Sequence, residues 1–168
     1  MGGSGTIPLT EAQAAFIAGP RSIFAASRGA DGLPSLCRAL ACKVAADRRS
    51  VTVLLHPQRA AALLQDIAAS GEIAVVFNEP PTHRTLQIKG RDARPVSTPA
   101  DAAQSVDAHI EAFAQELDPM GFRGHLIGVV VRGAPEPNGL VPVAVQFTPD
   151  AVFEQTPGPR AGARVSGA

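Results

Sequence analysis

The stretch that decides the fold is Ser50-Val-Thr-Val-Leu-Leu-His-Pro-Gln-Arg-Ala-Ala-Ala-Leu-Leu64. An apolar, β-branched run ends at Leu55, and a helical pattern follows at once, with Pro57 placed as its first residue. Arg59 then falls in the first helical turn, where free N–H groups and the helix dipole favour an anion over a cation. Free N–H groups together with an arginine are typical of a phosphate site. The alternative is that Arg59 simply points into solvent.

The segments on either side of this stretch alternate short β-rich runs with turn residues. Before it we expect a helix over 10–18, capped by Thr10, and strands over 22–28 and 35–44. After it we expect the helix 57–70, a long helix opening at Thr98-Pro99, and strands over 73–77, 83–93, 141–148 and 151–155. Residues 121–132 have strand propensity but follow a helix at a position that suits a second helix, so both remain open.

Short antiparallel strands with a few inserted helices predict a mainly β fold, a barrel with peripheral helices. The 168 residues are 45% hydrophobic and carry no formal net charge, which predicts one domain. We expect a flexible lead over 1–9, a single domain over 10–156 and an irregular tail over 157–168.

The composition also limits the compartment and the partners. There is no basic excess, which argues against nucleic acid, and no apolar run of membrane length or signal peptide. Cys37 and Cys42 are five residues apart on one expected strand, so they point to opposite faces and do not pair. We therefore expect a reduced, cytoplasmic protein.

Several kinds of reactive site have no signature in this sequence. The chain lacks a P-loop, a glycine fingerprint and a Gly-x-Ser-x-Gly elbow. The four histidines are too scattered in sequence to predict a metal site. Four acidic residues of the long helix are expected on its solvated face: Asp101, Asp107, Glu111 and Glu116.

The remaining cluster is cationic and lies on neighbouring predicted elements: Arg38, Lys43, Arg59, Arg84 and Lys89. Such groups would converge on one anionic ligand if the strands are neighbours in the sheet. The two-residue period of a strand, however, places Arg38 and Lys43 on opposite faces. Both reach one ligand only if the strand carries a β-bulge or if one side chain curls over the strand end.

The segment Asp31-Gly-Leu-Pro-Ser-Leu-Cys-Arg-Ala-Leu-Ala-Cys-Lys43 resembles a hairpin and strand of the pyridoxamine 5'-phosphate oxidase-like, FMN-binding split-barrel family. That family has an Arg, four apolar residues and a Lys, which matches Arg38 to Lys43. Its later motifs match in order over roughly residues 22–97. They are the strand 51–55, the turn Pro57-Gln58-Arg59, the strand 73–77 and Arg84-Thr-Leu-Gln-Ile-Lys-Gly90. Phe153-Glu-Gln-Thr-Pro-Gly resembles the C-terminal strand.

The resemblance implies an antiparallel split β-barrel of the FMN-binding type, and a homodimer with the flavin at the subunit interface. Arg38 and Arg59 match the family's phosphate-binding cations, and Lys43 matches a lysine near the flavin ring. The other implied contacts are the backbone of Leu54 and Leu55, Gln58 in the phosphate turn, and Thr85 where the family has a ring-contacting glutamine. The resemblance assigns no catalytic residue.

The sequence also departs from the family pattern. Pro57 replaces the phosphate-binding serine, Glu154 stands where the oxidases have a tryptophan, and the C-terminal Arg-x-His motif is missing. These differences argue against pyridoxamine phosphate as the substrate, and they leave a deazaflavin or haem open as the ligand. We expect an FMN-dependent oxidoreductase acting on an unknown small molecule. The alternatives are a non-catalytic protein that binds or senses flavin or haem, and a structural dimer without a ligand.

Overall fold

The computed structural model describes residues 8–133 and 139–165. Within these residues, eight strands form one antiparallel sheet in the order β6-β7-β3-β2-β1-β4-β5-β8. The strands are β1 (Ser22–Arg28), β2 (Pro34–Val44), β3 (Val51–Leu55), β4 (Ile73–Glu79), β5 (Arg84–Gly90), β6 (Arg94–Val96), β7 (Val143–Phe147) and β8 (Ala151–Glu154). The helices are α1 (Glu11–Ala18), α2 (Ala61–Ser70), α3 (Ala102–Leu117) and α4 (Gly124–Arg132), with a 3-10 turn, η1 (Asp118–Met120), between the last two.

The sheet curls around a central core, as the mainly β, split-barrel prediction requires. Alternate residues of the strands point inward, and their side chains are almost fully buried. The core draws side chains from both halves of the sheet, among them Ile23, Val53, Val75, Ile88, Val145 and Phe147. The predicted fold class is confirmed.

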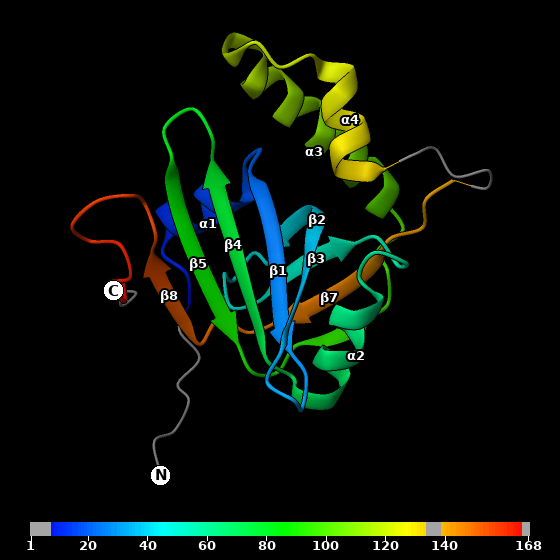
Figure 1. Cartoon of the computed structure of the whole chain (residues 1–168), viewed down its shortest axis with the longest axis vertical. Coiled ribbons are helices and arrows are strands. Elements are labelled where there is room, and N and C mark those ends of the chain that lie inside the picture. The colour runs from blue at the N-terminus through cyan, green and yellow to red at the C-terminus, as the bar shows by residue number, and fades with distance from the viewer. Residues whose placement is uncertain (1–7, 134–138, 166–168) are drawn as a thin grey trace.

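A second, smaller core lies outside the barrel, beneath the hairpin of α3 and α4 (Figure 1). Leu40 and Leu54 project from the outer surface of β2 and β3 and pack with Val106 of α3 and Ile127 of α4. Residues 121–132, left open between strand and helix, are therefore helical over Gly124–Arg132. The helix prevails because Ile127 and Val131, four residues apart, bury one face against α3 and the barrel.

Strand β2 carries the bulge on which the sequence argument depended. Its pairing with β3 shifts between Ala39 and Ala41, so that one extra residue is accommodated at Leu40. Ala39 points into the barrel core, whereas both Leu40 and Ala41 face the outer core under the helical hairpin. As a result Arg38 and Lys43 return to the same, outer face of the sheet.

Two helices begin later than the sequence suggested. The predicted start of α2 at Pro57 is wrong: residues 57–60 form turns, and the helix begins at Ala61. Ala60 N–H donates to the His56 carbonyl and Ala61 N–H to the Gln58 carbonyl, so a turn precedes the helix. Proline suits the early positions of such a turn as well as the first position of a helix.

The start of α3 was also predicted wrongly. The helix begins at Ala102 rather than at Thr98-Pro99, and Asp101 precedes it without a side-chain cap. Thr98 Oγ1 instead donates a hydrogen bond of 3.0 Å to the carbonyl of Pro142, at the other end of the second core. The Thr98 hydroxyl, which the local pattern assigned to the helix N-cap, therefore makes a tertiary contact instead.

The strand expected over 83–93 ends early, at Gly90, and β6 (Arg94–Val96) is a further strand that the sequence did not predict. Strand β5 ends at Gly90, where an added Cβ would lie 2.6 Å from Phe147 Cδ2. Glycine thus permits the close approach of the Phe147 ring at the point where the chain leaves one half of the sheet. After residues 91–93, β6 pairs with β7 in the other half.

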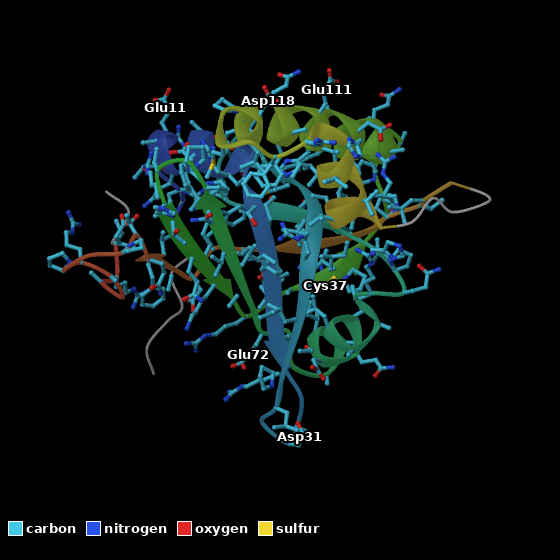
Figure 2. All side chains as sticks on the ribbon, turned by 45° about the horizontal axis from the view of Figure 1, so that its top comes forward. Glu11, Asp31, Cys37, Glu72, Glu111 and Asp118 are labelled. Atoms are coloured by element: carbon cyan, nitrogen blue, oxygen red, sulfur yellow. The ribbon has the colours of Figure 1, made fainter. Side chains whose placement is uncertain are left out.

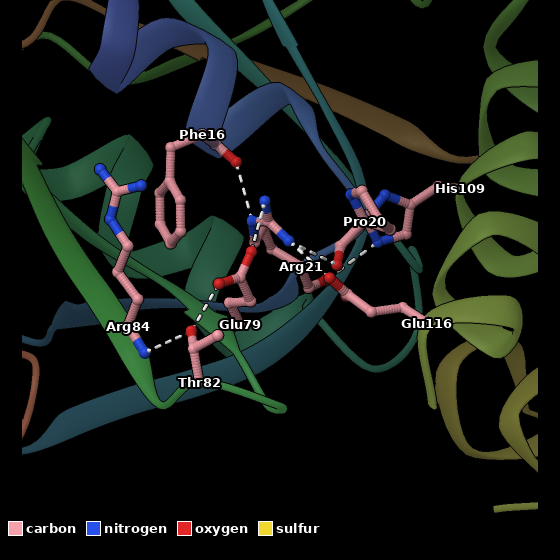
Figure 3. Close-up of polar contacts among 8 residues, drawn as sticks. All are labelled: Phe16, Pro20, Arg21, Glu79, Thr82, Arg84, His109 and Glu116. Carbon is pink, nitrogen blue, oxygen red and sulfur yellow. Dashed lines mark hydrogen bonds and ion pairs between the residues drawn. The ribbon is translucent and has the colours of Figure 1, made fainter. Parts of the chain in front are cut away.

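A network centred on Arg21 joins the barrel to the helical hairpin (Figure 3). Its guanidinium lies 2.9 Å from Glu79 of β4 and 2.9 Å from Glu116 of α3, and it stacks on the Phe16 ring of α1. His109 Nε2 of α3 also lies 3.0 Å from the Arg21 carbonyl. The three charged side chains are at most 20% exposed, so this network fixes α3 against the barrel end.

Of the four acidic residues expected on the solvated face of the long helix, three are exposed and Glu116 is partly buried. Glu111 points outward from the helix (Figure 2). Asp107, in contrast, pairs with Arg132 of α4, Asp101 with Lys43, and Glu116 with Arg21. The expectation of a solvated face is confirmed for Asp101 and Asp107, which are exposed although each pairs with a cation, and it is wrong for Glu116, which is only 19% exposed beside Arg21.

The ends of the chain are described only in part. Residues 1–7 of the expected lead and 166–168 of the expected tail lie outside the described residues. Leu9 is buried, and its N–H donates to the Arg48 carbonyl. Residues 157–164 form turns and a bridge, and Val165 N–H donates to the Val152 carbonyl of β8. Among the described helices, none has the length and apolar character to cross a membrane.

Candidate functional site

The outer surface of β1, β4 and β5 faces the viewer in Figure 1 without a helix over it. The strand register places Ser22 opposite Asn78 and Asn78 opposite Thr85 on this face. The next row along contains Arg38, Phe24, Val76 and Gln87. Most of these side chains are only half-buried, so the surface offers polar groups around an apolar centre. We call it the open sheet face.

Arg38 is the cation most closely associated with the open sheet face. Its guanidinium stacks on the Phe24 ring, with 4.3 Å to the centroid, and Nη1 donates a 3.0 Å hydrogen bond to Ser22 Oγ. Burial lowers the pKa of this guanidinium from its ordinary value. Among the described residues it forms no ion pair with a carboxylate. A half-buried arginine without an acidic partner is suited to an anionic ligand.

Lys43 shares the outer surface with Arg38 but already has a partner. Its Nζ lies 2.6 Å from both carboxylate oxygens of Asp101, just before α3. The hydrogen bond from Lys43 lowers the pKa of the Asp101 carboxyl. Both side chains are well exposed, at 35% and 58%, so solvent screens the pair and a ligand can compete for the lysine.

Arg59 lies at the corner between β3 and α2, but its surroundings differ from those predicted. Because the helix begins at Ala61, Arg59 is not in its first turn. Its guanidinium lies instead beside Gly133, just after α4, where an added Cβ would come within 2.9 Å of Arg59 Cζ. The negative end of the α4 dipole favours a cation there. The helix-terminus argument for a phosphate therefore does not apply to Arg59, which is exposed, and its contact with a phosphate stays a prediction.

The remaining residues predicted on β3 and its corner have separate surroundings. Leu54 packs in the second core under α3, whereas Leu55 faces the barrel interior. Gln58 is exposed in the turn that precedes α2. A ligand would therefore reach Leu54 and Leu55 through backbone groups alone, which is the kind of contact that the family resemblance implies for them.

Thr85 lies at the opposite side of the open sheet face and is satisfied within the chain. Its hydroxyl donates to the His83 carbonyl and accepts from Asn78 Nδ2 at 2.8 Å. Its backbone N–H donates to Thr156 Oγ1 at 3.0 Å. Thr156 in turn donates to Glu154, and these hydrogen bonds lower the pKa of the Glu154 carboxyl, with nearby Arg160 and Arg84 adding to the effect.

The predicted site residues therefore do not converge on one point within a single chain. Arg38 and Lys43 share the outer surface of β2, Arg59 lies beside the end of α4, and Thr85 lies across the sheet on β5. Sequence reasoning missed Ser22 and Phe24, the two partners of Arg38. An alternation of Ser22 and Phe24 with the buried Ile23 was a readable signal that both point outward.

Nucleophilic and metal chemistry find little support in the described part of the chain. Burial raises the pKa of the Cys42 thiol to about 12 and also raises that of Cys37 above its ordinary value. Both thiols are consequently protonated near neutral pH and are weak nucleophiles. Within residues 8–133 and 139–165, no three His, Cys, Asp or Glu side chains are grouped so as to hold a metal ion.

Comparison with known proteins gives structural neighbours only. No family model matches the sequence, and no curated protein does. HupZ of Group A Streptococcus superposes with a TM-score of 0.55 at 14% identity, covering 92% of this chain and 99% of that one. A putative pyridoxamine 5'-phosphate oxidase from Lactobacillus delbrueckii has a TM-score of 0.51 at 18% identity, covering 89% and 96%.

A third solved structure, an F420 reductase, has a TM-score of 0.51 at 16% identity, covering 86% of this chain and 98% of the other. Each alignment spans nearly all of both chains, so the likeness concerns the whole domain and not one motif. At such low identities it establishes the arrangement of strands and helices alone. The chain has the split-barrel fold of the pyridoxamine 5'-phosphate oxidase-like proteins.

Proposed function

We propose that this protein binds FMN and is an oxidoreductase that acts on a small molecule. The observation that carries the proposal is Arg38, a half-buried guanidinium on the open sheet face whose described partners are a hydroxyl and an aromatic ring. The β2 bulge supports it further, because it brings Lys43 to the same surface. An FMN phosphate would supply the negative charge that Arg38 lacks.

The phosphate and the ring of a flavin would contact different residues of this chain. Arg38 would bind the phosphate, while Lys43 would place a positive charge near the ring by leaving Asp101. A bound flavin would supply hydride or electron transfer, and the protein would hold and orient it. Thr85 does not reach the same ligand from within one chain, since it lies three strands away from Arg38.

This separation supports a homodimer in which the flavin lies between two chains. Arg38 of one chain and Thr85 of the other would then contact opposite sides of one ligand. An apolar strip on α4 supports the same assembly: Leu126, Val129 and Val130 recur on one helix face and are each more than half exposed. The opposite face of α4 is buried, so the helix is apolar on both sides, as expected for a helix with a second partner.

A non-catalytic flavin-binding protein is the second candidate, and one observation favours it. The described partners of Arg38 are Ser22 and Phe24, neither of which is a general acid or base at neutral pH. Such a protein would bind the flavin as tightly but would not turn over a reductant. A deazaflavin or haem would fit the same exposed, cation-bearing face and is distinguished by its spectrum.

The proposal is tested by the absorbance spectrum of the purified protein before and after FMN addition and desalting. The chain contains no Trp or Tyr, so bound flavin dominates the near-ultraviolet region. We expect flavin bands to survive desalting in the wild type and to be lost in Arg38→Gln. Arg123→Gln, which removes an exposed arginine at the start of α4, is the matched control and should retain them. A wild-type protein that retains no FMN would overturn the proposal.

A further inference from the structure

An open pocket of about 760 Å³ lies at the end of the sheet away from Thr85, between the ends of β1, β4, β5 and β8. These strands are adjacent in Figure 1, and Glu72, which lines the pocket, marks this end of the sheet in Figure 2. A volume of this size is within the range of sites for small organic ligands. The residues proposed for FMN do not line it.

Small side chains meet across the neighbouring strands that line the floor of the pocket. The register aligns Ala26 of β1 with Ala74 of β4, Ala74 with Lys89 of β5, and Lys89 with Ala151 of β8. Three of the four positions in this row are alanines, whose small side chains leave space above the sheet, and the fourth is Lys89 of β5. We call this space the alanine pocket.

The walls of the alanine pocket supply an aromatic ring and positive charge. Lys89 Nζ lies 5.1 Å from the centroid of the Phe153 ring, and Arg164 Nη2 donates to the Asp150 carbonyl at 3.1 Å. At the rim, Arg28 pairs with Glu72 and Arg91 pairs with Asp150. The two lining carboxylates are thus engaged by two arginines, while Lys89 and Arg164 form no ion pair among the described residues.

We propose that the alanine pocket binds a planar aromatic anion, a carboxylate or a phosphate ester. The alanine floor and the Phe153 ring favour a planar apolar body, because both surfaces offer dispersion contact without a steric demand. Lys89 and Arg164 favour a negative group on that body, since each is a cation without a carboxylate partner. A neutral ligand of the same shape would lack this second attraction.

The alanine pocket is distinct from the site proposed for FMN. Lys89 lies four residues beyond Thr85 along β5, a separation of about 13 Å in a strand. Lys89 is also three strands away from Arg38 and two residues further along the strand direction, which gives a separation of about 16 Å. Arg38 and Lys89 can therefore be tested independently.

The test is calorimetric titration of the full-length protein with 2-naphthoate, 2-naphthyl phosphate and the neutral 2-naphthamide. We expect at least one anion to bind about tenfold tighter than the amide, and the tighter of the two identifies the anionic group. Lys89→Gln should weaken that anion about tenfold, and Ala74→Leu should abolish binding by filling the floor. Arg123→Gln and Ala108→Leu, both exposed sites elsewhere, should bind as the wild type does.

Three results would overturn the inference: no binding of either anion, equal binding of the amide, or unchanged affinity in both Lys89→Gln and Ala74→Leu. Melting temperatures of the variants show whether a loss of binding reflects unfolding. Saturating FMN should leave the naphthoate affinity unchanged, and displacement by FMN would contradict a separate site. If the protein fails to retain FMN but binds the anion, the proposed flavin function fails while the alanine pocket stands.

Discussion

Arg21 and Arg38 are neighbours at the same end of β1, and they are alike in all but one respect. Both side chains are partly buried and their guanidiniums stack on a phenylalanine ring, at 4.5 Å from Phe16 and 4.3 Å from Phe24. Arg21, however, lies between two carboxylates, whereas the polar side-chain partner of Arg38 is the Ser22 hydroxyl. Burial of a charge is costly unless it is paired, so the two arginines must serve different purposes.

We interpret Arg21 as a structural arginine, whereas Arg38 is the arginine proposed to bind a ligand. The charge of Arg21 is neutralised by Glu79 of β4 and Glu116 of α3, and these ion pairs hold α3 to the barrel (Figure 3). Arg38 lies on the open sheet face, and no carboxylate among the described residues compensates its charge. The number of carboxylates around a buried cation is therefore more informative about function than the cation itself.

Removing the charge of Arg21 should have the largest effect on stability. Arg21→Met strands the Glu79 and Glu116 carboxylates in a partly buried site, and we expect a loss of about 3 kcal/mol in the free energy of unfolding. Urea denaturation measures the change. Arg28→Met is the matched control, because the Arg28–Glu72 pair is exposed, and it should cost less than about 1 kcal/mol. Similar losses in both variants would contradict the structural role of Arg21.

Arg59 differs from both Arg21 and Arg38, because its guanidinium lies against the backbone at Gly133. Gly133 has a φ of +97°, and its missing side chain leaves room for the Arg59 guanidinium. Gly133→Ala should destabilise the protein by about 2 kcal/mol, because alanine is strained at this φ and must displace Arg59. FMN binding should weaken as well if Arg59 contacts the phosphate. Gly124→Ala at the start of α4, where the added Cβ makes an ordinary contact, should not destabilise the protein and should leave FMN binding unchanged.

The pH dependence of stability tests the balance of charge around Arg21. Burial raises the pKa of the Glu116 carboxyl, the Glu79 carboxylate adds to this, and Arg21 opposes it only in part. A raised pKa in the folded state means that the folded protein binds the proton more tightly than the unfolded chain does. The contribution of Glu116 to stability should therefore decline as the pH rises above the ordinary carboxyl value. Glu116→Gln removes this decline.

Urea denaturation of both proteins between pH 4 and 7 measures that difference. We expect Glu116→Gln to gain stability relative to the wild type as the pH rises. A constant difference across this range would show that Glu116 titrates as in the unfolded chain, and the opposite slope would show that Arg21 dominates its surroundings.

The smallest predicted effect concerns the cation that shares the surface of Arg38. Asp101 competes with any anionic ligand for Lys43, so Asp101→Asn should raise the affinity for FMN by a factor of about two to five. Flavin fluorescence during titration measures the affinity. Asp107→Asn, which breaks the ion pair between α3 and Arg132, is the control and should leave it unchanged. Weaker FMN binding in Asp101→Asn would show that Lys43 depends on Asp101 for its position.

Local sequence patterns predicted most of the barrel but not the exact ends of its helices. The strands over 22–28 and 51–55 match the observed β1 and β3, because alternation in the first and β-branched, apolar residues in the second are typical of strands. The starts of α2 and α3 were missed because Pro57 also suits a turn and because Thr98 bonds to Pro142, far along the chain. Distant contacts of this kind leave no local signal.

The site was predictable as a set of residues but not as an arrangement. Arg38 and Lys43 could both face one ligand only through a β-bulge or through a side chain that curls over the strand end, and the register shift at Leu40 supplies the bulge. In contrast, nothing local to Lys43 or Arg59 indicated that Asp101 and Gly133 would lie beside them. The pairing state of each cation therefore had to come from the structure. Whether the predicted residues bind a flavin stays a prediction.

The most direct test of the account is the affinity of the wild type and of Arg38→Gln for FMN and for riboflavin, which lacks the phosphate. We predict that the wild type binds FMN at least about tenfold tighter than riboflavin, and that Arg38→Gln removes this preference while leaving riboflavin binding unchanged. Equal affinity of the wild type for both flavins, or a preference for FMN that survives in Arg38→Gln, would contradict the claim that the uncompensated charge of Arg38 serves a phosphate.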